Sequence, residues 1–156
     1  MSIDSRSITD AFRKVAELAN VQMAATDLRI EELPAPHRPT GLPPGSMAVY
    51  VFSYGRTTLK VGKAGPNSDA RFRSQHYNPR SAASTLAASI LKNPTPVGNP
   101  AVDDDSVGDW IRENADRVNF ILPERVGIEV LTLLEAYIQC RLKPVYEGFQ
   151  SQRSRT

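Results

Sequence analysis

Residues 46–63 of the chain read SMAVYVFSYGRTTLKVGK, and this stretch decides the fold. Its first half, residues 48–52, is mostly β-branched or aromatic, a composition that suits a pleated sheet. Gly55 and Arg56 then mark a reversal of the chain, and residues 57–62 form the return strand. The stretch therefore predicts a β-hairpin, around which the rest of the domain is built.

The loop at the tip of this hairpin decides which side chains share a face, because side chains alternate between the two faces of a strand. A two-residue turn at Gly55 and Arg56 would pair Tyr50 with Val61 and send Lys60 to the opposite face. A three-residue loop that begins one residue earlier would pair Tyr50 with Lys60 and place both on one face. Both registers remain open at this point.

The segments on either side of the hairpin predict an α/β fold. Residues 118–122 form a third strand, which Pro123 ends. Apolar periodicity, capping residues and breakers predict helices over residues 8–22, 68–77 and 82–91, from residue 106, and over 126–142. We therefore expect a small, mostly antiparallel three-stranded sheet flanked by helices.

Proline content divides the chain into three parts. Five of the twelve prolines lie between residues 34 and 44, where they remove amide donors and favour a connector. Residues 1–45 are therefore expected to be an N-terminal extension, made of one helix and this connector. Residues 46–148 form the core domain, and residues 149–156 form a polar tail.

Composition places the protein among ordinary globular domains. A chain of 156 residues fits one domain. It contains no apolar run of about 18 residues, and its first ten residues are polar, so neither a membrane span nor a secretory signal is expected. Cys140 is the only cysteine and cannot form an internal disulfide. We expect a cytoplasmic protein without a membrane partner, and the sequence does not indicate an oligomeric state.

Three further residues are weighed as site candidates. His37 lies among prolines and is expected to have no role in a site. Trp110 is expected to belong to the core rather than to a base-stacking platform, and Cys140 to be a buried thiol.

The near-neutral net charge of +2 hides an uneven distribution. Residues 49–92 contain seven Lys and Arg but one Asp, a surplus of six positive charges, and the acids that balance it lie elsewhere. A local basic block can be an electrostatic footprint for phosphate, or it can be a solvated surface.

Glu135 interrupts the apolar stripe of the last predicted helix. It lies four residues after Leu131 and three before Ile138, both of which belong to that stripe. Burying an ionised carboxylate is costly unless it is paired or binds a metal. Glu135 is therefore a candidate metal ligand, unless it bends to solvent or pairs with an arginine.

Four segments, in their order and spacing, resemble the GIY-YIG nuclease superfamily. The first motif matches residues 48–50 (Ala-Val-Tyr), and the second, ten residues on, matches residues 60–62 (Lys-Val-Gly). Residues 71–77 look like the family's arginine helix, and Glu135 lies in a segment similar to its metal-binding segment. The resemblance covers residues 47–147. It implies a metal-dependent endonuclease that hydrolyses phosphodiester bonds in DNA.

The resemblance also implies a metal ion and an arginine for the phosphate. Mg²⁺ or Mn²⁺ would be held by Glu135, and one carboxylate suffices because Mg²⁺ keeps several of its waters. Arg73 would hold the phosphate and stabilise its transition-state charge, because Tyr77 follows four residues later, where the family often places His or Tyr. Arg71 is the alternative to Arg73.

The other implied roles fall on the hairpin and the arginine helix. Tyr50 would position or activate the attacking water, and His76 could serve as general base because its ordinary pKa is near neutrality. Lys63, Arg71 and Tyr77 are expected to contact the DNA.

Three departures from the family's pattern open alternatives. Ala48 replaces the usual Gly, Glu147 stands where the family often has Asn and could join the metal site, and Lys60 replaces the second motif's Tyr. Lys60 could contact phosphate or lower the pKa of Tyr50. It could equally indicate a catalytically inactive nucleic-acid-binding module. The proline-rich stretch and the acidic C-terminal third favour a third possibility, a protein-interaction domain.

Overall fold

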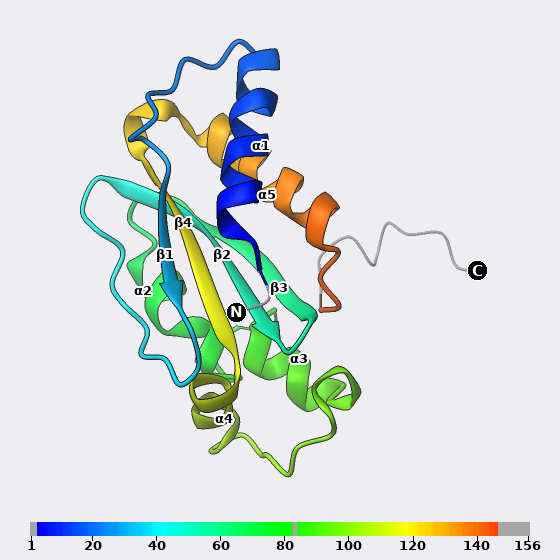
Figure 1. Cartoon of the computed structure of the whole chain (residues 1–156). Coiled ribbons are helices and arrows are strands. Elements are labelled where there is room, and N and C mark those ends of the chain that lie inside the picture. Colours follow the sequence, from blue (N-terminus) through cyan, green and yellow to red (C-terminus); the bar gives the residue numbers. More distant parts are fainter. Residues whose placement is uncertain (1–2, 83, 147–156) are drawn as a thin grey trace.

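The computed structural model describes residues 3–82 and 84–146, which form a four-stranded antiparallel sheet with helices on both faces (Figure 1). The strands lie in the order β1-β4-β2-β3 and comprise β1 (Arg29–Leu33), β2 (Ser46–Tyr54), β3 (Thr57–Ala64) and β4 (Asp116–Pro123). The helices are α1 (Ser5–Leu18), α2 (Asp69–Arg73), α3 (Leu86–Lys92), α4 (Val107–Asn114) and α5 (Ile128–Leu142). Short 3-10 turns follow at η1 (Gln75–Tyr77), η2 (Thr95–Val97) and η3 (Glu124–Val126). The predicted α/β class, with a mostly antiparallel sheet, is confirmed.

The predicted number of three strands is wrong, because β1 adds a fourth strand antiparallel to β4. The sequence of β1, RIEEL, carries three charges, and the strand is largely exposed at the sheet edge. It therefore lacks the β-branched and aromatic composition on which strand prediction depends.

On one face of the sheet, Ile8 and Phe12 of α1 are buried in the same apolar layer as β2 and β4. Residues 3–45 thus contribute a helix and a strand to the packed domain.

A β-bulge sets the register of the β2–β3 hairpin, which is neither of the two expected. Tyr54 pairs with Thr57, so the turn is the two-residue one, with Gly55 at φ +59°. The pairing shifts by one residue between Phe52 and Ser53, so that Phe52 lies opposite Lys60. An extra residue in one strand moves every side chain beyond it to the opposite face of the sheet. Tyr50 and Lys60 therefore share one face in spite of the tight turn.

Alternation along the strands creates two apolar layers. The helices that cover them lie on opposite faces of the sheet (Figure 1). One layer packs the sheet against α1 and α5, and the other packs it against α2, α3 and α4. Ala48, Tyr50 and Phe52 of β2 all face the second layer. The first and second motif residues therefore point toward the arginine-bearing helix α2.

Several predicted boundaries move because local capping overrides periodicity. Asp4 accepts a hydrogen bond from the Ser7 amide, so α1 begins earlier than expected. Thr85 caps α3 in the same way. The helix expected over residues 68–77 is divided into α2 and η1.

Two further expectations concern the C-terminal part of the chain. Cys140 is exposed, so the prediction of a buried thiol is wrong. Glu147 and the tail of residues 149–156 lie outside the described residues. Within residues 3–82 and 84–146, none of the helices has the length and apolarity needed to cross a membrane.

Candidate active site

The side chain of Tyr50 lies over Gly62 of the neighbouring strand. The two residues are direct partners in the β2–β3 ladder, and Tyr50 is fully buried. A Cβ atom on Gly62 would lie 2.5 Å from the Tyr50 hydroxyl oxygen and 2.6 Å from Cζ, closer than real Cβ contacts. Glycine at position 62 therefore makes room for the phenol ring, which reaches across β3 toward the sheet edge.

We expect Gly62→Ala to destabilise the protein by about 1–3 kcal/mol, because the added methyl group overpacks the site and displaces the Tyr50 ring. Urea unfolding at pH 7 measures the change. Gly65→Ala is the matched control, because a Cβ there would meet Ile128 Cδ1 at an ordinary 3.6 Å. Equal stabilities of the two variants would contradict the packing of Tyr50 on Gly62.

His76 presents one ring nitrogen to Tyr50 and the other to the backbone. Nε2 lies 2.5 Å from the Tyr50 hydroxyl oxygen, and Nδ1 lies 3.2 Å from the Leu86 amide nitrogen. The Leu86 N–H can only donate, so Nδ1 is the acceptor and the proton of the neutral ring is on Nε2. Burial, together with the positive charges of Lys60, Arg117 and Arg71, lowers the pKa of His76 to about 2. His76 is therefore a neutral donor to Tyr50, and both nitrogens are engaged, which does not suit the expected role of general base.

The lowered pKa of His76 predicts a loss of stability in acid. In the unfolded chain His76 takes up a proton near pH 6.5, whereas in the folded protein it does so only near pH 2. Between these values the unfolded state binds more protons, so the free energy of unfolding falls as the pH falls, by about 1 kcal/mol per pH unit. His76→Gln is expected to flatten this dependence in urea unfolding between pH 7 and 4. His37, whose pKa burial also lowers, acts equally in both proteins. Parallel curves for the two proteins would exclude the buried neutral imidazole.

Arg71, rather than Arg73, lies next to Tyr50. Arg71 Nε donates to the Tyr50 hydroxyl at 3.4 Å. Burial raises the pKa of Tyr50, and the hydrogen bond and charge of Arg71 oppose this rise. Arg73 points away, with Nε 3.9 Å from Asp69 Oδ2 and its guanidinium against Gly41. Of the two arginines considered for the phosphate, Arg71 therefore lies beside Tyr50, and the first choice, Arg73, does not.

Tyr77, expected to contact DNA, is buried and only 4% exposed. Its hydroxyl accepts a hydrogen bond from Arg117 Nη1 at 3.0 Å and lies 2.7 Å from His37 Nε2. His37 Nδ1 in turn lies 2.8 Å from the Ala115 carbonyl oxygen, so this nitrogen carries the proton and Nε2 accepts from Tyr77. Tyr77 thus belongs to the framework behind the site, and His37, expected to have no role, is part of that framework.

Of the two lysines of β3, Lys60 lies on the face of Tyr50, whereas Lys63 pairs with Glu135 on the α5 side of the sheet. Lys60 is 5% exposed and shares the face of Tyr50, and its charge contributes to the low pKa of His76. Lys63 Nζ lies 3.7 Å from Glu135 Oε1 and donates to Thr132 Oγ1 at 3.2 Å. The negative charge of Glu135 raises the pKa of Tyr50, which places the carboxylate within electrostatic range of the hydroxyl. Glu135 is therefore paired with a lysine, and its side chain is still 20% exposed.

Glu135 could hold a divalent ion only with the help of water or substrate oxygens. Within the described part of the chain, no group of three or more His, Cys, Asp or Glu side chains could hold a metal ion. A single, partly exposed carboxylate suits Mg²⁺, which takes one or two carboxylates and retains several waters. The Lys63 ammonium group would have to give way to such an ion, because both compete for the same oxygens.

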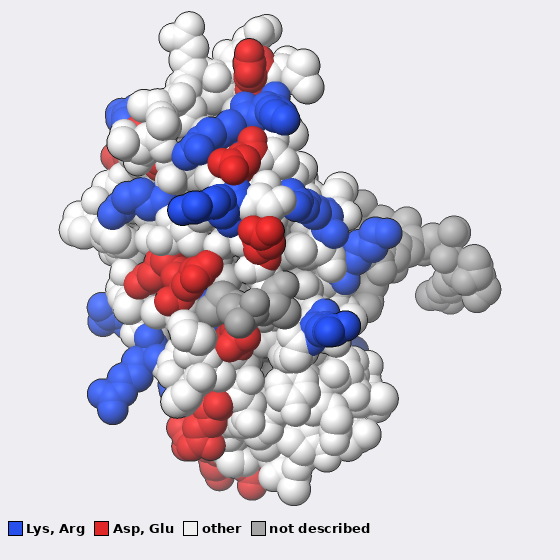
Figure 2. All heavy atoms as spheres, in the orientation of Figure 1, with Lys and Arg blue, Asp and Glu red and all other residues white. Residues whose placement is uncertain are grey.

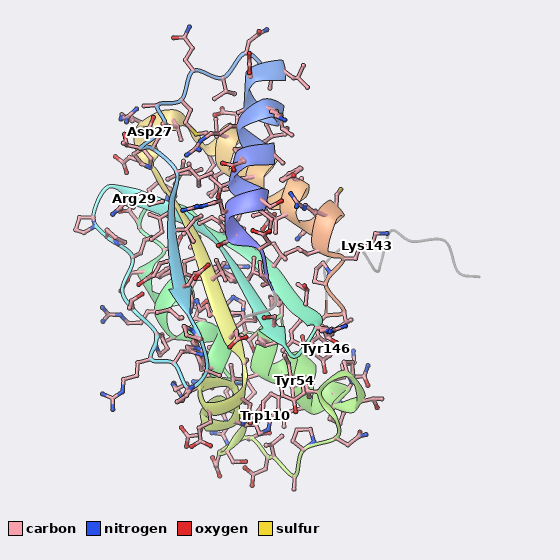
Figure 3. All side chains as sticks on the ribbon, viewed as in Figure 1. Asp27, Arg29, Tyr54, Trp110, Lys143 and Tyr146 are labelled. Atoms are coloured by element: carbon pink, nitrogen blue, oxygen red, sulfur yellow. The ribbon has the colours of Figure 1, made fainter. Side chains whose placement is uncertain are left out.

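The side of the molecule that α1 covers carries charges of both signs (Figure 2). Lys and Arg side chains are interspersed there with Asp and Glu. Trp110, expected in the core, is partly buried and packs with Tyr54, the ring centroids 5.3 Å apart, at one end of the sheet (Figure 3). Trp110 also packs against the second apolar layer, the layer that contains Tyr50.

Sequence reasoning missed a polar row that crosses the sheet behind the site. Glu31, Asn119, Tyr50 and Gly62 are successive partners across the four strands. Asn119 Nδ2 donates to Glu31 Oε2 at 3.0 Å, and Arg117 Nε donates to Asn119 Oδ1 at 2.8 Å. The alternation of polar and apolar residues in β4 was a usable signal. Taken alone, however, this alternation predicts a strand with one face exposed to solvent, because the helices that cover the polar face are not known from the sequence.

Comparison of the chain with protein-family models, with curated proteins and with solved structures finds no significant match. The assignment of the site therefore depends on its geometry and on the chemistry of its residues.

Proposed function

We propose that the chain is a metal-dependent endonuclease of the GIY-YIG type that hydrolyses phosphodiester bonds in DNA. The observation that carries the proposal is the Tyr50 hydroxyl, which contacts both His76 and Arg71 while its ring lies over Gly62. The pairing of Tyr50 with Gly62 supplies a physical reason for the two hairpin motifs of the resemblance. It also explains why a glycine ends the second motif.

In this proposal the Tyr50 hydroxyl positions the attacking water. The hydroxyl oxygen receives N–H donors from His76 and Arg71, and burial raises the pKa of Tyr50, so the phenol keeps its proton and donates a hydrogen bond to the water. As the water attacks phosphorus and one P–O bond breaks, a proton of the water passes to the departing oxygen. Neutral His76 holds the phenol ring in position and does not itself transfer the proton.

Arg71 and Glu135 divide the remaining work. Arg71 is exposed and lies beside Tyr50, so its guanidinium can hold a phosphate oxygen next to the attacking group. Glu135 would hold Mg²⁺ or Mn²⁺, and a bound ion of this kind supplies positive charge for the scissile phosphate. Lys63 is partly exposed next to Glu135 and would contact the DNA backbone.

A second candidate function is a nucleic-acid-binding module that does not cleave. The observation that favours it is the Lys63 ammonium group 3.7 Å from Glu135, a cation already on the proposed metal ligand. The face that carries Tyr50 has Lys60 where the resemblance would place a second tyrosine, and this replacement also favours a module that does not cleave. Such a module would bind DNA with an affinity that falls steeply with salt, because its cations neutralise phosphates and release their counterions. It would not hydrolyse the DNA.

A plasmid-nicking assay separates these functions. Supercoiled plasmid is incubated with the protein in Mg²⁺, in Mn²⁺ and in EDTA, and a gel-shift measurement at low salt is run in parallel. Nicked or linear DNA with either metal and intact DNA in EDTA is the expected result. A gel shift without nicking would establish the non-cleaving module. Absence of both would overturn both functions in favour of a protein-interaction domain.

A further inference from the structure

Arg117 of β4 is the largest fully buried side chain of the described residues. Its guanidinium donates to three neutral acceptors: Asn119 Oδ1 at 2.8 Å, the Tyr77 hydroxyl at 3.0 Å and the Phe72 carbonyl oxygen at 2.6 Å. Removing a charge from water costs several kcal/mol, and a well-packed apolar side chain often serves a core as well or better. Stability of the core alone therefore does not account for an arginine at this position.

The partners of Arg117 all adjoin the candidate active site. Phe72 directly follows Arg71 in α2, and Tyr77 directly follows His76 in η1. The guanidinium carbon also lies 5.4 Å from the centre of the Tyr50 ring, a distance at which a cation attracts an aromatic face. One buried side chain thus contacts Tyr50 itself and the immediate neighbours of both groups that hydrogen-bond to it.

Helix α2 needs this support more than the longer helices do. It has five residues, and its N-cap, Ser68, makes no side-chain capping bond. Short helices are marginal without tertiary packing, and their last carbonyl groups have no partner within the helix. Arg117 Nη2 bonds one of these carbonyls, that of Phe72. The position of Arg71 relative to Tyr50 therefore depends on a residue of the sheet.

We propose that Arg117 is a positioning residue for the active site: by holding Phe72 and Tyr77, it places Arg71 and His76 against the Tyr50 hydroxyl. The inference rests on the proposed function for the roles of Arg71 and Tyr50. In the active protein, Arg117→Lys is expected to lower kcat about tenfold and to leave KM nearly unchanged, because the substrate still meets an intact surface.

The test measures two protons and needs no DNA. NMR hydrogen exchange is recorded for Arg71 Nε–H and for His76 Nε2–H in the wild-type protein and in Arg117→Lys. The lysine keeps the positive charge but lacks the planar guanidinium that donates to three acceptors at once. Both protons are expected to exchange about tenfold faster in the variant, as their hydrogen bonds to Tyr50 loosen. Phe120→Leu is the control, because Phe120 is equally buried in β4 but faces the α1 and α5 layer. It should lower stability and leave both protons as in the wild type.

Three outcomes would overturn the inference. These are unchanged exchange of both protons in a folded Arg117→Lys protein, equal acceleration in Phe120→Leu, and failure of Arg117→Lys to fold, judged by circular dichroism, which would assign Arg117 to core stability. Loss of the proposed function is a separate result. A wild-type protein that binds DNA without nicking it would refute the nuclease, and the exchange data would still decide the role of Arg117.

Discussion

Glu135→Ala is expected to reduce Mg²⁺-dependent nicking by about a thousandfold or more while the protein stays folded. A bound metal contributes several kcal/mol to the stabilisation of the transition state, and each 1.4 kcal/mol is about a factor of ten in rate. Stability should fall by no more than about 1–3 kcal/mol, because Lys63, the cation left behind, is 37% exposed and can be solvated. The rate is measured on supercoiled plasmid at saturating Mg²⁺, and folding is followed by urea unfolding.

Glu129→Ala is the matched control for this substitution. Glu129 lies on the same helix, α5, and is exposed in its first turn, and among the described residues it forms no ion pair with Lys63. We expect it to cleave at the wild-type rate within about twofold, as usual for a surface substitution. Nicking by Glu135→Ala at the rate of Glu129→Ala would remove Glu135 from the metal site and with it the proposed nuclease mechanism.

Arg71→Ala is expected to reduce the nicking rate by about a hundredfold to a thousandfold, whereas Arg73→Ala should change it by less than about twofold. Removing one preorganised hydrogen-bond donor that stabilises the charge of the transition state typically lowers the rate by about a hundredfold to a thousandfold. The two arginines are a natural comparison, because both are exposed, both belong to the five-residue helix α2, and alanine favours helix. Only Arg71 donates to the Tyr50 hydroxyl, since Arg73 is directed toward Asp69.

Steady-state kcat and KM for both variants, measured under the same metal and salt conditions, test this difference. A loss confined to Arg73→Ala would refute the site as described and restore the sequence-based choice. Equal losses in both variants would indicate that α2 contributes a general basic surface rather than one catalytic arginine.

Much of the candidate site could be predicted because its residues carry local signals. The β-branched and aromatic composition of β2 predicts a strand wherever that segment folds, and it places Tyr50 and Phe52 on one face. Glu135 stands out within the apolar stripe of α5, and Leu131 and Ile138, on either side of it, are buried. Such signals lie within a few residues of one another, so no knowledge of the rest of the chain is needed.

Other features depended on contacts between distant segments. The β1 strand has a charged, unremarkable sequence and forms because β4 offers it an edge, about 88 residues away at the Glu31–Asn119 pair. The choice of Arg71 over Arg73 depends on which side of a short helix faces Tyr50. His76 looks like a general base by its ordinary pKa, but burial makes it a neutral hydrogen-bond donor.

The sequence by itself determined the α/β class, the hairpin and the group of side chains from which the site is drawn, because periodicity and turn chemistry act over a few residues. Only the tertiary structure decided how those side chains meet. The bulge in β3 brings Lys60 to the face of Tyr50, and the packing of α2 and α4 against the sheet buries Arg117 behind the site. The physical reason is that facing, burial and the protonation of buried groups are properties of the surroundings, which are assembled from strands and helices far apart in the chain.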